Sequence, residues 1–469
     1  MSEDGDKASG DSHKSVEQKL EPLVPKIPDV ELIVDGFGFM PKGGISGKGR
    51  SGSIFHRPSA AKEPSVTEEE GKSPCASSTN IDIVRRYTWK TKNRMTVQVI
   101  TYGATITSIQ VPDRKGVPDD VLAGFDTLEE YFQPRNPYFG GTIGRYANVI
   151  QDGTMVVRPS GRTYMLSTNK GQNHYHGGYI GFDKVNWRAY VDGYKVIMSH
   201  VSERFSEGYP GTVMAQVTFE VTCDNTLKVT MKCTTSEPTA INLSQSPYFN
   251  LAGHHAGPEP MLDHIFSINA DKFTVADEEG LVTGEKRIVG GTAYDFRVPR
   301  VLRTMLPKIP LGGYDVNFCI TQGTEQELTF QARALHPMSG RVLELYSNQP
   351  GMQFYTGNLL PDPDKIVEPE PEGEEEQEDE GSESSRSSVM GENGGEEEEE
   401  NEGKPRYGYV PLLGKSGTIY RKHGLFCLMP QNYPDAINHR NFPCAVLNPG
   451  EVYVHSIQYK FGILLGKYI

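Results

Sequence analysis

Short stretches of alternating polar and apolar residues, separated by turn sequences, recur along most of this 469-residue chain. Residues 95–101 and 104–111 alternate in this way and are rich in β-branched side chains, and they are separated by Tyr102 and Gly103. A period of two places successive side chains on opposite faces of a strand, so these runs predict strands with one buried face.

Hairpin signals follow at regular intervals. The turn sequences are Pro159-Ser160-Gly161, Asp192-Gly193 and Asp224-Asn225, each flanked by two strand-like runs. Helical periodicity is scarce, and residues 128–132 predict one short helix. Many short strands without interleaved helices are typical of antiparallel sheets. We therefore expect an all-β fold, a large antiparallel β-sandwich.

A strongly acidic block interrupts this pattern. Residues 361–403 hold 19 Asp or Glu residues against Lys365 and Arg386, whereas the formal charge of the whole chain is −14. Dense like charge favours a solvated, extended chain. Because strand-like sequence resumes near Arg406, residues 361–405 are predicted to be a disordered insertion in a loop. Its clustered serines beside acidic residues suggest phosphorylation sites, although a simple solvated spacer is the preferred interpretation.

Residues 1–80 are rich in Ser, Gly, Lys and Glu and predict a disordered N-terminal tail. The apolar stretch 30–40 is the exception. It could be an additional edge strand of the following domain or a short motif for a protein partner, and we favour the edge strand. The predicted organisation is a tail over 1–80 and one β-sandwich domain over 81–469, interrupted by 361–405.

Composition also limits location and partners. The six cysteines are widely spaced without a C-x-x-C pair, which favours reduced thiols over disulfides or a zinc site. We see no secretory signal and no apolar run of about 18 residues, so we expect a cytoplasmic protein without membrane contact. No stripe of Lys and Arg residues stands out that would bind the phosphates of a nucleic acid. We expect a monomer, with the tail or the acidic insertion as possible contacts for a protein partner.

The segment 173–178 brings together several side chains that can take part in binding or catalysis. Its sequence is Asn-His-Tyr-His-Gly-Gly, so two histidines and an aromatic ring precede a glycine pair. Histidine donates and accepts protons near neutral pH, and glycines allow close backbone approach. On local evidence, a loop with solvent-facing histidines is an equal alternative.

Several motifs in order resemble one family, the aldose 1-epimerases or galactose mutarotases. The matching segments are residues 138–148, 176–178, 181–185, 207–211, 242–243, 248–253, 313–318, 349–358 and 431–436. The resemblance runs from about residue 85 to the C-terminus, apart from the acidic insertion. It implies a β-sandwich with a sugar-binding groove on one face and no cofactor.

The resemblance also assigns residues to the groove. The positions that match hydroxyl-contacting residues of the family are Asn148, His176, Tyr248, Asp315 and Gln353. An ionised aspartate accepts strong hydrogen bonds from hydroxyls, and amides both donate and accept. The alternatives are a core tyrosine for Tyr248 and a strand-pair amide for Gln353; structural roles are also possible, with less weight, for Asp315 and His176.

The proton-transfer positions do not match. Interconverting sugar anomers requires a base for the C1 hydroxyl and an acid for the ring oxygen. The family's acid histidine falls at Ser246, its base glutamate at Met429 and a substrate-contacting arginine at Val149. None of these side chains can perform the corresponding task. His174, two residues before His176, is the only nearby additional histidine, and it is not expected to replace the acid.

Three functions remain open at this point. We favour a hexose-binding protein of the galactose or glucose type with weak or no epimerase activity. The first alternative is an active aldose 1-epimerase that uses replacement groups or a water molecule. The second is an interaction scaffold without a ligand, in which the tail and the acidic insertion carry the function.

Overall fold

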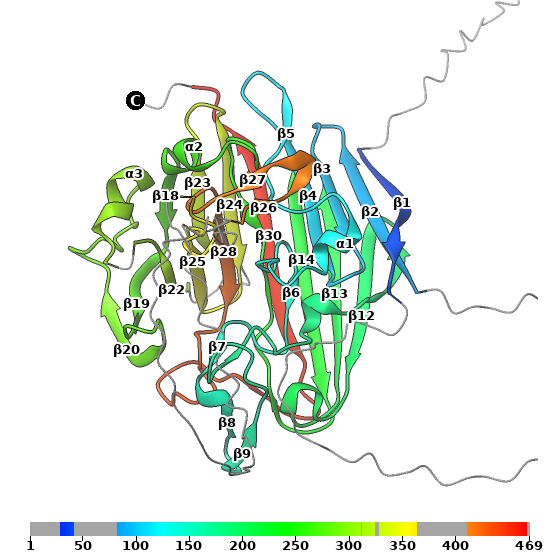
Figure 1. The fold of residues 1–469 in the computed structure, drawn as a ribbon, viewed down its shortest axis with the longest axis vertical. Coiled ribbons are helices and arrows are strands. Elements are labelled where there is room, and N and C mark those ends of the chain that lie inside the picture. The colour runs from blue at the N-terminus through cyan, green and yellow to red at the C-terminus, as the bar shows by residue number, and fades with distance from the viewer. Residues whose placement is uncertain (1–28, 42–81, 311, 324–327, 364–409, 467–469) are drawn as a thin grey trace, which may run out of the picture.

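A computed structural model describes residues 29–41, 82–310, 312–323, 328–363 and 410–466 (Figure 1). The predicted disordered tail, except for residues 29–41, lies outside the described residues. So does the acidic insertion from residue 364 onward. The description below concerns the β-rich remainder.

The largest sheet has nine strands and runs through the centre of the molecule (Figure 1). In sheet order its strands are β11 (Arg188–Asp192), β12 (Lys195–Ser202), β13 (Val213–Thr222), β14 (Thr226–Thr235), β30 (Tyr453–Ile463), β24 (Arg341–Ser347), β23 (Thr329–Leu335), β18 (Ile265–Ile268) and β21 (Arg300–Val301). Neighbouring strands pair in antiparallel fashion, including β14 with the C-terminal strand β30.

Two further antiparallel sheets supply the other side of the core. One has five strands: β1 (Val30–Phe39), β2 (Ile83–Thr91), β3 (Thr96–Ile100), β4 (Thr105–Pro112) and β5 (Pro118–Asp120). The other has six, in the order β17 (Tyr248–Phe249), β28 (Phe426–Gln431), β25 (Gly351–Tyr355), β22 (Asp315–Ile320), β19 (Ala270–Ala276) and β20 (Val282–Ile288).

One continuous apolar cluster joins the three sheets. Trp89 of the five-stranded sheet, Phe219 of the nine-stranded sheet and Phe354 of the six-stranded sheet all belong to it, and all are fully buried. Burial of such side chains is the main favourable term in folding. The cluster confirms the β-sandwich, with the nine-stranded sheet as one layer and the two smaller sheets as the other.

The remaining elements are short. Two-stranded pairs are β10 (His174–Tyr175) with β7 (Val149–Ile150), β8 (Thr154–Val157) with β9 (Arg162–Met165), β16 (Ser244–Gln245) with β6 (Thr142–Ile143), β15 (Thr239–Ala240) with β29 (Val446–Leu447), and β26 (Leu412–Leu413) with β27 (Ile419–Tyr420). The helices are α1 (Leu128–Tyr131), α2 (Pro258–Leu262) and α3 (Leu302–Met305). In the described part of the chain, no helix is long and apolar enough to span a membrane.

The apolar island near the N-terminus is an edge strand. As β1 it pairs with β2 in antiparallel register, from Val30 opposite Thr91 to Phe39 opposite Ile83. Phe37 packs edge-on against Tyr131 of α1, with ring centroids 6.2 Å apart. The expectation that this segment docks on its own domain is confirmed.

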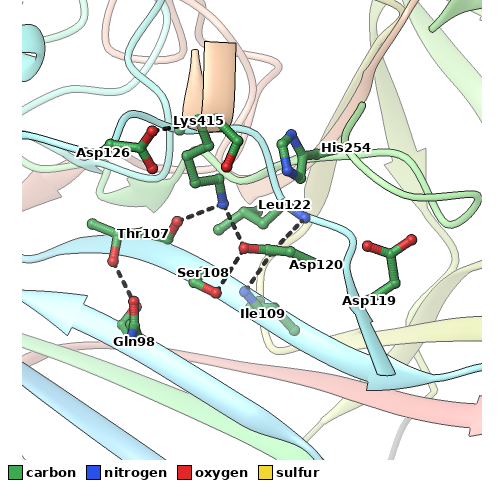
Figure 2. A network of polar contacts seen from close by, with 12 residues as sticks. Gln98, Thr107, Ser108, Ile109, Asp119, Asp120, Leu122, Asp126, His254 and Lys415 are labelled. Carbon is green, nitrogen blue, oxygen red and sulfur yellow. Dashed lines mark hydrogen bonds and ion pairs between the residues drawn. The ribbon is translucent and has the colours of Figure 1, made fainter. Parts of the chain in front are cut away.

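The chain that follows the acidic insertion is fixed by a buried ion pair (Figure 2). Lys415, between β26 and β27, donates to Asp120 at 2.7 Å and to the carbonyl of Thr107 at 2.9 Å. Burial acts to raise the pKa of the Asp120 carboxyl, but the Lys415 ammonium and the hydrogen bonds outweigh it, so that pKa lies below its ordinary value. On the other flank of the insertion, Lys422 pairs with Asp362 at 3.1 Å.

Candidate functional site

Four strands of the six-stranded sheet present a common row of side chains on the face opposite the core. In antiparallel pairing, residues directly opposite each other share a face. We call this surface the site face, and its members are Tyr248, Cys427, Met429, Gln431, Gln353, Tyr355, Asp315 and Asn317. Their neighbours along the strands, such as Phe354 and Leu428, point into the core.

The site face brings Asp315 and Gln353 together, as the resemblance implies. Nε2 of Gln353 donates a hydrogen bond of 2.7 Å to Oδ1 of Asp315. Although Asp315 as a residue is exposed, protein surrounds its carboxyl and raises the pKa of that carboxyl above its ordinary value. The Gln353 hydrogen bond and the positive charge of Lys170 act in the opposite direction without cancelling this effect.

Tyr248 lies at the other end of the same row. It is buried, and its ring contacts Phe139 and Tyr355 edge-on, with centroids 5.0 and 5.9 Å away. Burial raises the pKa of its phenol well above the ordinary value, so the hydroxyl stays protonated at neutral pH. Tyr248 therefore forms part of an aromatic wall beside Cys427.

His176 and Asn148 form a second group, on loops. The Asn148 amide donates to Nδ1 of His176 at 3.0 Å, and the His176 amide donates to the Asn148 carbonyl at 3.1 Å. The backbone φ angle is positive at both residues, 69° at Asn148 and 50° at His176. A Cβ on the next residue, Gly177, would lie 1.9 Å from the carbonyl oxygen of Gly144, so only glycine fits there.

The other histidine of this motif lies elsewhere. Nε2 of His174 is 2.7 Å from the hydroxyl of Tyr209, and its Nδ1 is 2.7 Å from the carbonyl of Ser167. His174 is fully buried and thus serves the packing of this loop.

Tyr175 and Lys170 connect the His176 loop with the sheet. The Lys170 ammonium lies 4.1 Å from the centre of the Tyr175 ring, and that ring lies 3.9 Å from the His176 ring. The charge of Lys170 acts on both His176 and Asp315, and the Asp315 charge acts on the Tyr175 phenol. Lys170 therefore lies within electrostatic range of both His176 and Asp315.

His176 is a neutral hydrogen-bond donor at physiological pH. Burial lowers its pKa to about 3, helped by the charges of Lys170 and Lys184. Because Nδ1 accepts the Asn148 amide, Nε2 carries the proton. A neutral imidazole can hydrogen-bond a hydroxyl, but it cannot act as an imidazolium acid.

The position of the family's acid holds the hydroxyl of Ser246, which lies next to the thiol of Cys427. Ser246 is buried and hydrogen-bonds the Cys427 thiol. Burial raises the pKa of that thiol well above its ordinary value, and the Ser246 hydrogen bond only partly offsets this effect. The thiol therefore stays protonated, and neither group is a strong acid or a base near neutral pH.

Met429 occupies the position of the base. It lies directly opposite Gln353 in the strand pairing, is 5% exposed and packs in an apolar cluster with Tyr248 and Cys427. Val149, at the arginine position, is 5% exposed and pairs with Tyr175. The β28 side of the site face is therefore uncharged.

Beside Gln353 the site face contains buried amides with unused polar atoms. Asn317 lies directly opposite Gln353, and Gln431 lies two residues beyond Met429 on the same strand. Both polar atoms of Asn317, both of Gln431 and Oε1 of Gln353 lack a hydrogen-bond partner among the described residues. Each such buried atom costs about 1–3 kcal/mol unless a water or ligand satisfies it.

The sequence analysis did not assign Asn317, Gln431, Tyr355 or Cys427 to the groove, although the first three lie within the matching segments. A usable signal existed, because all four lie two residues from a position that was identified, and strand residues two apart share a face. No comparable signal marks Lys170, which reaches the site from the loop before β10.

Comparison with known proteins identifies the family of this chain. The family model described as aldose 1-epimerase matches residues 85–460. The galactose mutarotase of Homo sapiens is 39% identical over 367 residues, which are 78% of this chain and 91% of the human one. That of Sus scrofa is 38% identical over 371 residues, 79% of this chain and 92% of its own.

Solved structures show the same fold. A GalM/aldose epimerase homologue from C. elegans superposes with a TM-score of 0.64 at 24% identity, over 80% of this chain and 97% of its own. Galactose 1-epimerase from Lactobacillus acidophilus gives a TM-score of 0.61 at 21% identity, over 83% and 97%. Given the extent of the family match and the identity to the mutarotases, this chain belongs to the aldose 1-epimerase family.

Proposed function

We propose that this protein binds a hexose of the galactose or glucose type on the site face and has weak or no epimerase activity. The observation that carries the proposal is the Asp315–Gln353 hydrogen bond directly beside Met429. The pair offers a carboxylate and an amide to sugar hydroxyls, while the neighbouring side chain cannot accept a proton. Relatives named galactose mutarotase support the ligand class.

The five unused amide atoms near Gln353 support a ligand rich in hydroxyl groups. A hydroxyl is both donor and acceptor, so it can pair with either end of an amide. His176 adds a donor at Nε2, and the tyrosines provide ring faces of the kind found in ligand sites. The free thiols among the described residues also support the expected cytoplasmic location.

The alternative of an active epimerase has one observation in its favour. Asp315 is a carboxyl with a raised pKa, which is a property of many general bases. In that case Asp315 would take a proton from the sugar, and a water molecule or the neutral His176 would have to serve as proton donor. The absence of an imidazolium at Ser246 weighs against rapid catalysis.

Polarimetry and calorimetry on the full chain test the proposal together. Freshly dissolved α-D-galactose and α-D-glucose should mutarotate at nearly the spontaneous rate with the protein present, while calorimetry detects binding of at least one of them. Strong acceleration by the protein would establish the active epimerase instead. Absence of binding to both sugars would favour the interaction scaffold.

A further inference from the structure

A small cavity with three basic residues in its lining lies between the β8–β9 hairpin and the chain that follows β28, and none of its lining residues belongs to the site face. Its volume is about 110 Å³. The lining residues are Arg158, Ala436, Ile437, His439, Arg440, Phe442, Cys444, Ala445 and Val446. Three of these are basic types and none is acidic. The cavity exceeds the space of about 30 Å³ that one water molecule takes in the liquid.

Arg158 is held in place by the loop that it faces. One terminal nitrogen of its guanidinium donates to the carbonyl of Asn438 at 2.8 Å. Asn438 is fixed in turn, since its Nδ2 donates to Thr154 at 2.8 Å and to Asp435 at 2.7 Å. A guanidinium has five N–H donors, so most donors of Arg158 are left for a ligand.

Arg440 is not used by the fold. It is exposed, and within the described ranges it has no hydrogen bond, ion pair or ring contact. Two arginine residues with free donors thus line the same cavity. Planar guanidinium groups bind phosphate oxygens through paired hydrogen bonds, and this geometry makes arginine a preferred phosphate ligand.

The walls are packed well enough to hold the loop without an anion. The rings of His439 and Phe442 lie 4.9 Å apart, and Lys286 donates to the carbonyl of Asn441 at 3.1 Å. The Lys286 ammonium also lies 5.8 Å from the Phe442 ring, which adds positive charge nearby. The nearest carboxyl described at this loop, Asp435, is buried behind His439 at 3.4 Å and does not line the cavity.

We propose that this cavity is an anion site that binds a phosphate group through Arg158 and Arg440. The ligand is either inorganic phosphate or the phosphate of a small monoester, because both present the same tetrahedral oxygens. The proposed anion site shares no lining residue with the site face.

Titration calorimetry on the full chain tests the proposal, with inorganic phosphate and glycerol 3-phosphate as probes in chloride buffer of constant ionic strength. We expect saturable binding of at least one probe. Tighter binding of the monoester assigns the natural ligand to that class, and equal affinities assign recognition to the phosphate group alone. An unmodified protein that binds neither probe overturns the proposal.

Charge-removal variants test the residues. Arg440→Gln should weaken binding about tenfold by removing charge-assisted hydrogen bonds. It disturbs no packing, so it remains informative if Arg158→Gln unfolds the loop. Arg162→Gln on β9 is the matched control, because Arg162 is exposed, lies four residues from Arg158 and does not line the cavity. If Arg162→Gln weakens binding as much as Arg440→Gln, only net charge is being measured and the site does not exist.

Discussion

The backbone amide of Asn148 hydrogen-bonds Nδ1 of His176 at 3.0 Å, and this contact determines which nitrogen of the ring carries the proton. Together with the pKa of about 3, it makes His176 a neutral donor through Nε2 over the physiological pH range. In this protein, recognition of a sugar hydroxyl by His176 does not require the ring to be charged.

Asp315→Asn should weaken hexose binding. The change removes a charged acceptor, and hydrogen bonds to charged groups are worth about 1.5–3 kcal/mol, so the dissociation constant should rise about 10- to 100-fold. Calorimetry with D-galactose and D-glucose measures the effect. Asp192→Asn, an exposed carboxylate on β11, is the control and should leave affinity unchanged. If Asp315→Asn binds hexose as tightly as the parent protein, the sugar does not bind on the site face.

Restoring the missing acid and base should create activity. The double variant Ser246→His and Met429→Glu places the family's residue types at both positions. Each positioned proton transfer contributes about 10²–10⁴ in rate, so mutarotation followed by polarimetry should rise by at least 10² over the parent protein.

Met429→Gln is the control for this experiment, because glutamine has a polar side chain of the same length as glutamate but carries no basic group. It should leave the rate at the parent level. A double variant that binds hexose yet remains as slow as the parent would show that the acid and base are not the only missing elements, with Val149 as the next position to change.

Asn317→Leu should separate binding from stability. Both polar atoms of Asn317 are buried without partners in the described structure, so a similar-sized apolar side chain should leave the unfolding free energy unchanged or raise it. If the amide contacts the ligand, the increase in melting temperature produced by hexose should become smaller. A loss of stability without sugar, with the sugar-induced shift intact, would assign Asn317 to the fold alone.

Lys415→Met should destabilise the protein by about 3–5 kcal/mol, because it leaves the Asp120 carboxylate buried without its partner. Urea unfolding measures the change, and adding Asp120→Asn should recover part of it. Lys195→Met serves as comparison, because its ion pair with Glu220 is largely exposed and should contribute less than about 1 kcal/mol. Similar losses in both variants would contradict the assigned importance of the buried pair.

The Asp435 carboxyl should make the free energy of unfolding decrease as pH rises. Burial raises the pKa of its carboxyl to about 7 from an ordinary value of 3.8, so between these values the folded protein keeps a proton that the unfolded chain releases. Asp435→Asn removes this dependence. Urea unfolding at pH 4 and pH 8 should show the variant gaining about 2–4 kcal/mol relative to the parent over that interval. A constant difference would mean that the carboxyl is ionised in the folded protein.

Local features of the fold were predictable from the sequence because they depend on neighbouring residues. The Asp192-Gly193 turn joins β11 and β12, the Asp224-Asn225 turn joins β13 and β14, and residues 128–131 form α1. The apolar residues at 30–40 likewise favoured an edge strand over a motif for a partner, and the structure shows the strand. The turns and the helix depend on residues within about ten positions, whereas the pairing of β1 with β2 does not.

Long-range pairing was not predictable in this way. Gln353 lies opposite Met429 across the whole acidic insertion, and no local pattern specifies that register. The motifs found Asp315 and Gln353 by resemblance, but the coupling of Lys170 to both His176 and Asp315 depends on how two loops meet the sheet. That arrangement follows from tertiary packing, which sequence periodicity does not record.

The pairing of β25 with β28 has a consequence for how the protein folds. Gly351 and Gln431 meet only after the intervening segment has closed into a loop, whereas hairpins such as β13–β14 form between near neighbours. Loop closure adds an entropic cost that increases with the logarithm of length, about 0.6 kcal/mol for each doubling. We therefore expect the site face to assemble late, after the nearby hairpins. The length of the acidic insertion then sets the speed of that last step more than the stability of the finished protein.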